Sequence, residues 1–355
     1  MKIIHTADLH LDSTLERLSP SMARERNAEL AENFVRLVDY ARENGVRAVL
    51  LVGDVFDSPR CSELTVSLVL DSIRKAPQIY FLWLCGNHDG GAIILDRELP
   101  KNLLRFSDTW QGYDFGDAVI WGAELNADNC YTIYDTLRLD ADRCNLVLLH
   151  GEASNAAGAD KICLPRLRDR GIDYLALGHI HGYGSGRLDD RGVWVDPGCL
   201  EGRGFDECGD KGFVLLDVQN GCVSHEFIPF ARRRLHEISV DISGLTAVTE
   251  LRDALLNAAD GIPTGDLARF VLTGTYTAGT QKELNYLRRS LEGAFYYFDI
   301  RDESRLELRP EDYMNDVSLR GEFIRTVMAS DMEEADRDAV LMLGLRALSG
   351  QGVEL

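Results

Sequence analysis

Hydrophobic runs alternate with helix-like patterns over the first half of the chain. Six short apolar runs predict β-strands, namely "KIIHTA", "VRAVLLV", "IYFLWLC", "AVIWGA", "NLVLLH" and "DYLALG". Between the first two runs, apolar residues recur at helical spacing over 23–44, and a second helix is predicted over 62–75 with Ser62 as its N-cap. Strands that alternate with helices in this way are typical of a layered α/β domain.

After Gly182 the pattern changes to strands and turns. The segments "GVWVDPG", "KGFVLLDVQNG" and "CVSHEFIPF" predict three more strands. Asn220 and Gly221 lie between the last two, and Asn-Gly favours a two-residue hairpin turn. We expect the sheets of the two parts to pack together.

From residue 231 the pattern restarts as strand, helix, strand, helix and strand, with helices over 248–259 and 282–295 and strands over 267–276 and 296–308. This is enough for a small α/β domain. Beyond Tyr313, two short helices are predicted, whose apolar residues would dock on a partner or pack on their own chain. The predicted domains are therefore 1–230, a capping domain over 231–310 and a helical tail over 311–355.

Size and composition agree with this division. The chain has 355 residues, more than the roughly 250–300 at which a single core stops growing, and its 45% hydrophobic and 27% charged residues are typical of a globular protein. The net charge of −20 argues against binding nucleic acid mainly through a basic surface.

The eight cysteines form no CxxC pair, which favours reduced thiols. The first residues lack the apolar core of a leader, and no apolar run approaches the ~18 residues of a membrane span. We therefore expect a cytoplasmic protein without membrane contact.

Side chains with metal-ligand chemistry follow strand after strand. The set comprises Asp8, His10, Asp54, Asn87, His150, His179 and His181. Any one of them alone would usually be a cap or a satisfied polar group. Because α/β sheets build their sites at the carboxyl ends of strands, we expect the seven side chains to converge.

This donor set, with imidazole, carboxylate and amide but no thiolate, suits two divalent cations such as Mn²⁺, Fe²⁺ or Zn²⁺. Seven side chains can hold two ions and leave positions for water only if one carboxylate bridges. Asp54, central in chain order, is expected to be that bridge. Two ions ~3.5–4 Å apart can hold a phosphoryl oxygen and activate a water.

Three further residues are expected to support this chemistry. His88 is adjacent to Asn87, so its ring should lie at the metal pair and serve the leaving group. Asp57 would accept a hydrogen bond from His88 and orient its imidazole, or would cap a turn beside Ser58. Asp89 is expected to cap the following turn or to orient a ligand.

The blocks "DLH", "GDVFD", "GNHD", His150 and "GHIH" resemble, in this order, the five motifs of the calcineurin-like metallophosphoesterase superfamily. The resemblance implies an α/β fold, a double β-sandwich flanked by helices, with a dinuclear metal centre. It implies that His88 is the catalytic histidine. One metal would be held by Asp8, His10, Asp54 and His181, and the other by Asp54, Asn87, His150 and His179.

Within the superfamily, "HTADLHLDS", "GDVFDSP" and "VDPGCLEGRGFDECGDKGFVLLDV" are similar to the SbcD-type DNA repair exonucleases, and the tail is similar to their shorter YhaO-like bacterial relatives. This resemblance implies a manganese-dependent DNA exonuclease or endonuclease, an SMC-like ABC ATPase partner of the SbcC type and a homodimer. The chain departs from the pattern at Cys199, where relatives often have Ser, and in its acidity.

DNA would lie at the densest basic run, Arg232, Arg233 and Arg234, or at Arg166, Arg168 and Arg170, although a charge run is usually a solvated face. Two other functions stay open. The same two-metal chemistry would serve a phosphodiesterase or phosphatase for a small nucleotide. A regulator of an ATPase would instead keep the metals for structure alone.

Overall fold

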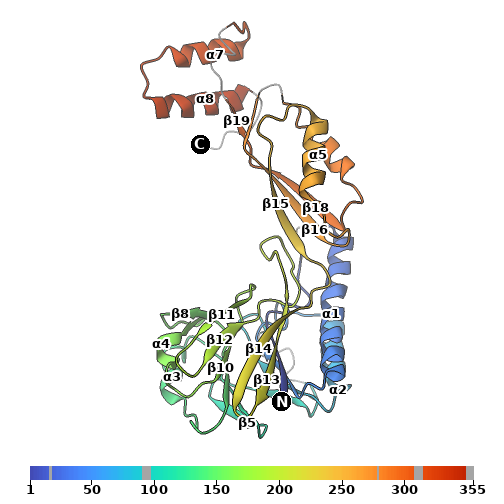
Figure 1. Cartoon of the computed structure of the whole chain (residues 1–355), viewed down its shortest axis with the longest axis vertical. Coiled ribbons are helices and arrows are strands. Elements are labelled where there is room, and N and C mark those ends of the chain that lie inside the picture. Colours follow the sequence, from blue (N-terminus) through green and yellow to red (C-terminus); the bar gives the residue numbers. More distant parts are fainter. Residues whose placement is uncertain (16–17, 90–96, 278–279, 308–314, 349–355) are drawn as a thin grey trace. The chain divides into compact units, whose positions relative to one another are not determined.

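The computed structural model describes residues 1–15, 18–89, 97–277, 280–307 and 315–348 (Figure 1). The chain divides into two compact units, Met1–Leu235 and His236–Leu355. The boundary between the two units lies a few residues beyond the expected domain boundary at 230. The expected capping domain and tail together form the second unit.

The first unit is built on two six-stranded sheets, with strand orders β14-β13-β1-β2-β3-β4 and β11-β12-β10-β7-β6-β5. The first sheet contains β1 (Lys2–Thr6), β2 (Ala48–Val52), β3 (Tyr80–Leu84), β4 (Leu103–Arg105), β13 (Gly212–Gln219) and β14 (Cys222–Pro229). The second contains β5 (Gln111–Asp114), β6 (Val119–Gly122), β7 (Asn145–Leu148), β10 (Tyr174–Ala176), β11 (Gly184–Arg187) and β12 (Val193–Asp196).

Parallel pairing brings strand ends together within each sheet. Strands β1 to β4 run parallel to one another, as do β6, β7, β10 and β12. The hairpin between β13 and β14 turns at Asn220 and Gly221, both with positive φ, as predicted. The carboxyl ends of the parallel strands therefore share one edge in each sheet.

The two sheets pack face to face, which confirms the double β-sandwich. In β2, Ala48, Leu50 and Val52 face the second sheet, whereas Val49 and Leu51 belong to the core beneath the helices. Because β2 is buried on both faces, its sequence is a continuous apolar run without alternation.

Helices cover the outer faces. On the first sheet lie α1 (Pro20–Glu43) and α2 (Glu63–Arg74), and on the second lie the short helices α3 (Ile133–Thr136) and α4 (Leu164–Leu167), with the pair β8 (Glu152–Ser154) and β9 (Lys161–Cys163) nearby in sequence. Helix α1 begins before residue 23 because Ser19 caps it and Pro20 occupies its first turn. Ser62 caps α2 as predicted.

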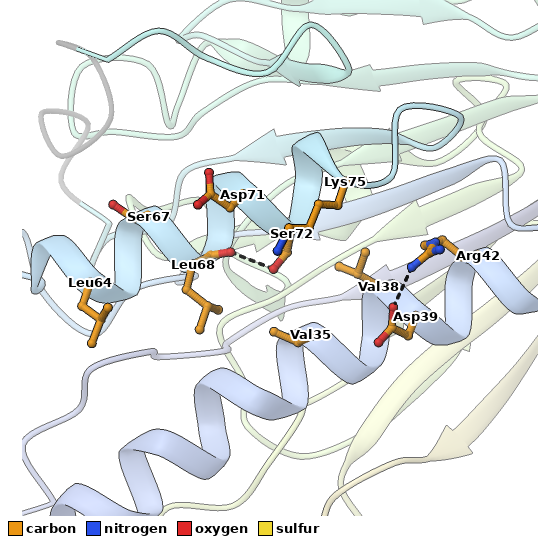
Figure 2. A pocket seen from close by; sticks show the side chains of 10 residues that line it. All are labelled: Val35, Val38, Asp39, Arg42, Leu64, Ser67, Leu68, Asp71, Ser72 and Lys75. Carbon is orange, nitrogen blue, oxygen red and sulfur yellow. Dashed lines mark hydrogen bonds and ion pairs between the residues drawn. The ribbon is translucent and has the colours of Figure 1, made fainter.

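A groove of about 350 Å³ runs between α1 and α2. Figure 2 shows Val35 and Val38 of α1 and Leu64 and Leu68 of α2 along it, with charged residues at one end. Ser72 donates to the Leu68 carbonyl, 2.7 Å away, so its hydroxyl is satisfied within α2. The side chain of Leu64 is 79% exposed, so the groove is open to solvent.

The second unit follows the predicted order of elements. Strands β15 (Leu235–Asp241), β16 (Leu267–Thr273) and β18 (Tyr297–Asp302) form a sheet, and α5 (Val248–Ala258) and α6 (Leu284–Ser290) pack on it. A second small pairing joins β17 (Thr275–Tyr276) to β19 (Arg305–Leu306).

Two further helices, α7 (Leu319–Met328) and α8 (Glu334–Leu348), form a hairpin in the tail. Its core consists of Ile324, Val327, Leu341 and Leu345. Part of the tail's apolar surface is thus packed on its own chain.

All eight cysteines are free. Among the described residues, the structure contains no helix with the length and apolar content that a membrane crossing requires.

Candidate metal centre

The structure brings all seven predicted ligands together at the carboxyl ends of β1, β2, β3, β7 and β10. Two clusters of predicted ligands have ligand atoms within 4.8 Å of one another: Asp8, His10 and His181 form one, and Asp54, His150 and His179 form the other. A third group at the same spacing joins His10 to Asp57 and His88. The Asn87 Oδ1 atom lies 3.2 Å from His150 Nε2, so Asn87 joins the second cluster.

Asp54 lies between the clusters. Its Oδ2 atom is 3.8 Å from His10 Nε2 and 3.3 Å from His150 Nε2. Its Oδ1 atom accepts a hydrogen bond of 2.8 Å from the backbone N–H of His88. One oxygen of Asp54 is therefore fixed by the backbone while the other faces both clusters, which is the geometry of a bridging ligand.

The tautomers of the histidines test whether these residues fit metal ions. His150 Nδ1 lies 3.0 Å from the Val52 carbonyl, and His181 Nδ1 lies 2.7 Å from Glu207 Oε1. The Val52 carbonyl can only accept, so His150 Nδ1 carries the hydrogen and its Nε2 carries a lone pair. His181 Nδ1 also has Arg203 Nη2 at 3.3 Å, but the closer Glu207 carboxylate favours the hydrogen on Nδ1 there as well.

His10 Nδ1 lies 3.0 Å from Asp57 Oδ1, an ion-pair contact outside hydrogen-bond geometry that also favours the hydrogen on Nδ1. Its Nε2 lone pair then faces the one on His181 at 3.1 Å, while the His150 lone pair faces oxygens of Asn87 and Asp54. Acceptors that converge in this way repel unless a cation lies among them. The residues fit a pair of divalent metals.

The contact between Asp54 and His150 shifts the pKa values of both side chains. Burial raises the pKa of Asp54, but the hydrogen bond and charge of His150 outweigh burial and bring it to about 2. Burial lowers the pKa of His150, but its bond to Asp54 and the charges of Asp8 and Asp54 bring it to about 9. The opposite shifts of the two pKa values show how strongly Asp54 and His150 interact.

The backbone is strained at the ligands. Asp8, His10, Asp54 and His179 have φ values of 51°, 43°, 50° and 109°. Residues other than glycine rarely adopt this region, and each such residue costs on the order of 1–3 kcal/mol. In the described part of the chain, half of the eight positive-φ residues other than glycine are predicted ligands, which indicates that the fold holds these side chains in a required geometry.

Two glycines allow the loops to approach the ligands. A Cβ atom on Gly53 would lie 2.0 Å from His150 Nδ1, and one on Gly86 would lie 2.2 Å from Asp54 Oδ1. The glycines in "GDVFD" and "GNHD" therefore make room for the opposing ligand.

His88 and Asp57 are both at the site, but they are not joined as expected. His88 Nδ1 donates to the backbone carbonyl of Asp57 at 2.9 Å, and the His88 ring is 5.0 Å from the His10 ring. The Asp57 carboxylate instead contacts His10 and Arg203. The predicted hydrogen bond from His88 to the Asp57 carboxylate does not form, because the backbone carbonyl of Asp57 accepts the hydrogen of His88 Nδ1 in its place.

Asp89 is hydrogen-bonded to the backbone of two loops that carry metal ligands. It is 3% exposed and accepts hydrogen bonds of 2.9 Å from the backbone N–H groups of Phe56 and Gly86. Burial raises its pKa to about 6. Asp89 therefore ties the loop after β2 to the loop after β3, in agreement with the expected supporting role.

Glu207 and Arg203 were not predicted from the residues. Glu207 contacts His181 Nδ1. Burial raises the pKa of Glu207, but the hydrogen bonds from His181 and Arg203 outweigh burial and bring this pKa to about 2. Glu207 and Arg203 lie in an irregular loop far from the other blocks in sequence. The only signal was the dense segment "GRGFDE" within the stretch that resembles SbcD-type enzymes.

The predicted DNA-binding arginines are engaged with carboxylates. Arg232 contacts Glu32, Arg233 contacts Glu29, and Arg234 contacts Asp210, each through a nitrogen–oxygen distance of 2.6 Å. Their role in DNA binding stays a prediction.

Comparison with known proteins assigns the family. The sequence pattern described as calcineurin-like phosphoesterase matches residues 1–183. The chain belongs to this family. Its members are hydrolases of phosphoester bonds with a dinuclear metal centre, in agreement with the two clusters that Asp54 joins.

Two relatives resemble the chain over much of its length. The uncharacterized metallophosphoesterase YhaO of Bacillus subtilis is 30% identical over 280 residues, which cover 71% of this chain and 65% of that protein. The DNA double-strand break repair protein Mre11 of Aeropyrum pernix is 24% identical over 267 residues, which cover 68% and 64%. The chain thus matches slightly less than two thirds of each relative.

Solved structures show looser likenesses. TT1561 of Thermus thermophilus has a TM-score of 0.41 at 13% identity and covers 64% of this chain and 98% of its own. A dimetal phosphatase from Danio rerio has a TM-score of 0.42 at 11% identity, with coverages of 62% and 93%.

Proposed function

We propose that this chain is a dinuclear-metal-dependent phosphodiesterase that cleaves DNA, as an exonuclease or endonuclease in DNA repair, with Mn²⁺ as its metal. The observation that carries the proposal is Asp54, whose Oδ2 faces both histidine clusters. The donor set without thiolates supports Mn²⁺ over a structural zinc site. The relative named as a DNA double-strand break repair protein supports DNA as the substrate.

The chain's own residues supply binding and proton transfer. Metal ions held in the two clusters would activate the phosphoryl group and a water. His88 is exposed, and its Nδ1 donates to the Asp57 carbonyl, so its Nε2 is the atom left to hold a proton beside the leaving oxygen. General acid catalysis of this kind contributes about 10²–10⁴-fold.

The test begins with purified protein, Mn²⁺ and bis(p-nitrophenyl) phosphate, followed by labelled linear DNA in single- and double-stranded form. We expect hydrolysis of both, abolished by a chelator and restored by Mn²⁺. His88→Ala should lower turnover at least ~100-fold with its Mn²⁺ content unchanged.

The other functions predict different results. Hydrolysis of small nucleotides without cleavage of DNA would assign the site to a nucleotide phosphodiesterase or phosphatase. A protein that binds Mn²⁺ and an ATPase partner but hydrolyses no phosphoester would be a metal-stabilised regulator. Failure to take up Mn²⁺ would exclude the proposed chemistry.

An SMC-like ATPase of the SbcC type is the proposed partner, with the α7–α8 hairpin as the docking segment. The inner face of the hairpin is packed, while Leu319 is 72% and Leu343 is 40% exposed. Among the described residues, half of the exposed large apolar side chains lie within residues 317–348, and such a concentration on one helix pair favours a binding face. Leu319→Glu should abolish co-purification with the ATPase and leave bis(p-nitrophenyl) phosphate hydrolysis unchanged, and binding by this variant at wild-type strength would place the partner elsewhere.

A further inference from the structure

A closed chain of polar contacts runs behind the first metal cluster. His10 Nδ1 lies 3.0 Å from Asp57 Oδ1, and His181 Nδ1 lies 2.7 Å from Glu207 Oε1. Arg203 joins the two carboxylates, because its Nη1 donates to the same Asp57 oxygen and its Nη2 to the same Glu207 oxygen, each at 2.8 Å. The Nε2 atoms of the two histidines lie 3.1 Å apart on the side of the metal cluster, which completes the ring of contacts.

We infer that Arg203 is a positioning residue that fixes the relative placement of His10 and His181 as ligands of one metal. This inference rests on the proposed metal centre. Each carboxylate faces the Nδ1 atom of its histidine, and Arg203 fixes how far apart the two carboxylates lie. Partners of this kind behind metal-bound histidines typically change metal affinity about 10–100-fold.

The surroundings hold Arg203 in place. Its side chain is 15% exposed and that of Glu207 is 4% exposed. The backbone N–H of Arg203 donates to Glu207 Oε2 at 2.7 Å, which folds the 203–207 loop back on itself. Lys211 Nζ donates to the His181 carbonyl at 2.6 Å and fixes the backbone of that ligand from the other side. The histidines are therefore placed by largely buried groups that are hydrogen-bonded to one another.

Arginine has a specific advantage at this position. Its planar guanidinium reaches two carboxylates with two different nitrogens, whereas the lysine ammonium is a single point of charge. The second cluster does not depend on this fork, because His150 Nδ1 donates to the Val52 carbonyl. Loss of Arg203 should therefore weaken one metal and spare the other.

A role of Arg203 through its charge and a role through positioning predict different metal affinities for its variants. If Arg203 acted only through its charge, Arg203→Met would remove a repulsive cation and strengthen metal binding, and Arg203→Lys would leave it unchanged. Positioning predicts that Arg203→Lys weakens binding although the charge is kept. The lysine variant also preserves the side-chain stem, so it provides the test if the methionine variant does not fold.

The experiment is a Mn²⁺ titration of the full chain by calorimetry, with electron paramagnetic resonance at saturation of the tighter site. We expect wild-type protein to bind two Mn²⁺ ions with the signal of a coupled pair. Arg203→Lys should bind one ion as the wild type does and the other about 10–100-fold more weakly, with the signal of isolated Mn²⁺ at intermediate concentrations.

The matched control is Arg191→Lys, which alters another arginine fork, on Asp173. It should bind two ions as the wild type does. A folded Arg203→Lys variant with two wild-type affinities, or an equal loss in Arg191→Lys, would overturn the role of Arg203 alone. A wild-type protein that binds no Mn²⁺ pair would instead overturn the proposed function.

Discussion

Asn87 and His88 are adjacent in sequence but have different partners. Asn87 Oδ1 points at His150 Nε2 among the ligands, whereas the His88 ring is held by the Asp57 carbonyl. Asn87→Ala should therefore lower Mn²⁺ affinity by at least ~10–100-fold, and excess Mn²⁺ should restore turnover in part. His88→Ala should lose turnover at every Mn²⁺ concentration. Metal titrations of activity measure this difference, and two variants with the same metal dependence would contradict it.

His5 predicts how stability depends on pH. It is fully buried in β1, where its ring contacts the Tyr174 hydroxyl and the Leu177 carbonyl, and burial lowers its pKa to about 3. Below pH 6.5 the unfolded chain protonates this side chain and the folded chain does not, so its contribution to stability is complete above pH 6.5 and falls towards pH 3. The slope is about 1.4 kcal/mol per pH unit.

His5→Gln tests this slope through urea unfolding of the metal-free protein between pH 7 and pH 4. The variant loses hydrogen bonds and should be less stable at pH 7, by about 1–3 kcal/mol. The difference from wild type should narrow as the pH falls, because only wild type loses the His5 contribution. A difference that stays constant with pH would show that His5 does not titrate in this way.

The loops after the strands depend on glycine for two separable reasons. Gly53 and Gly116 have almost the same φ, 83° and 85°, but a Cβ on Gly53 would overlap the His150 ring whereas one on Gly116 would meet nothing within 4 Å. Gly116→Ala should therefore cost only the backbone strain, about 1–2 kcal/mol.

Gly53→Ala should add the displacement of His150 to that strain and reduce Mn²⁺ affinity at least ~10-fold. The pair is compared by thermal unfolding and Mn²⁺ titration. Equal metal binding by the two variants would show that the loop after β2 can shift away from His150 without consequence.

The elements that the sequence predicted are those with strong local signals. Central strands such as β2 are continuous apolar runs, and α2 begins at its serine cap. The short strands β4, β8 and β9 were not predicted, since three residues carry no clear periodicity. Pairing with longer neighbours, as for β4 beside β3, makes them strands.

In the first unit, too, local sequence patterns predicted some features, such as the metal ligands, whereas contacts between distant residues could not be predicted. The ligands were predictable because each follows an apolar run, where a strand has to end. The buried side chains of Arg26 and Glu29 occupy polar positions of α1 that a helical pattern assigns to solvent. Their partners, Glu201 and Arg233, are more than 170 residues away in sequence, so only the fold reveals the contact.

For the whole molecule, all the candidate ligands lie within Met1–Leu235, and the second unit contributes none of them. Metal bound only to the folded state stabilises it by about 2.7 kcal/mol at a free concentration of 100 times Kd. Calorimetry should therefore resolve two transitions, and Mn²⁺ should raise the one from the first unit by roughly 5–10 °C. The melting temperature of the second unit should be the same in Mn²⁺ as in chelator.

Asp54→Asn identifies the metal-dependent transition. The amide keeps the size of the carboxylate but supplies no charged oxygen between the clusters, so the variant should lose most of the Mn²⁺ shift. Its second transition should match wild type, because Asp54 has no part in the core that α5 and α6 form with the sheet of the second unit. A Mn²⁺ shift of both transitions, or one retained in Asp54→Asn, would contradict a metal centre confined to the first unit and bridged by Asp54.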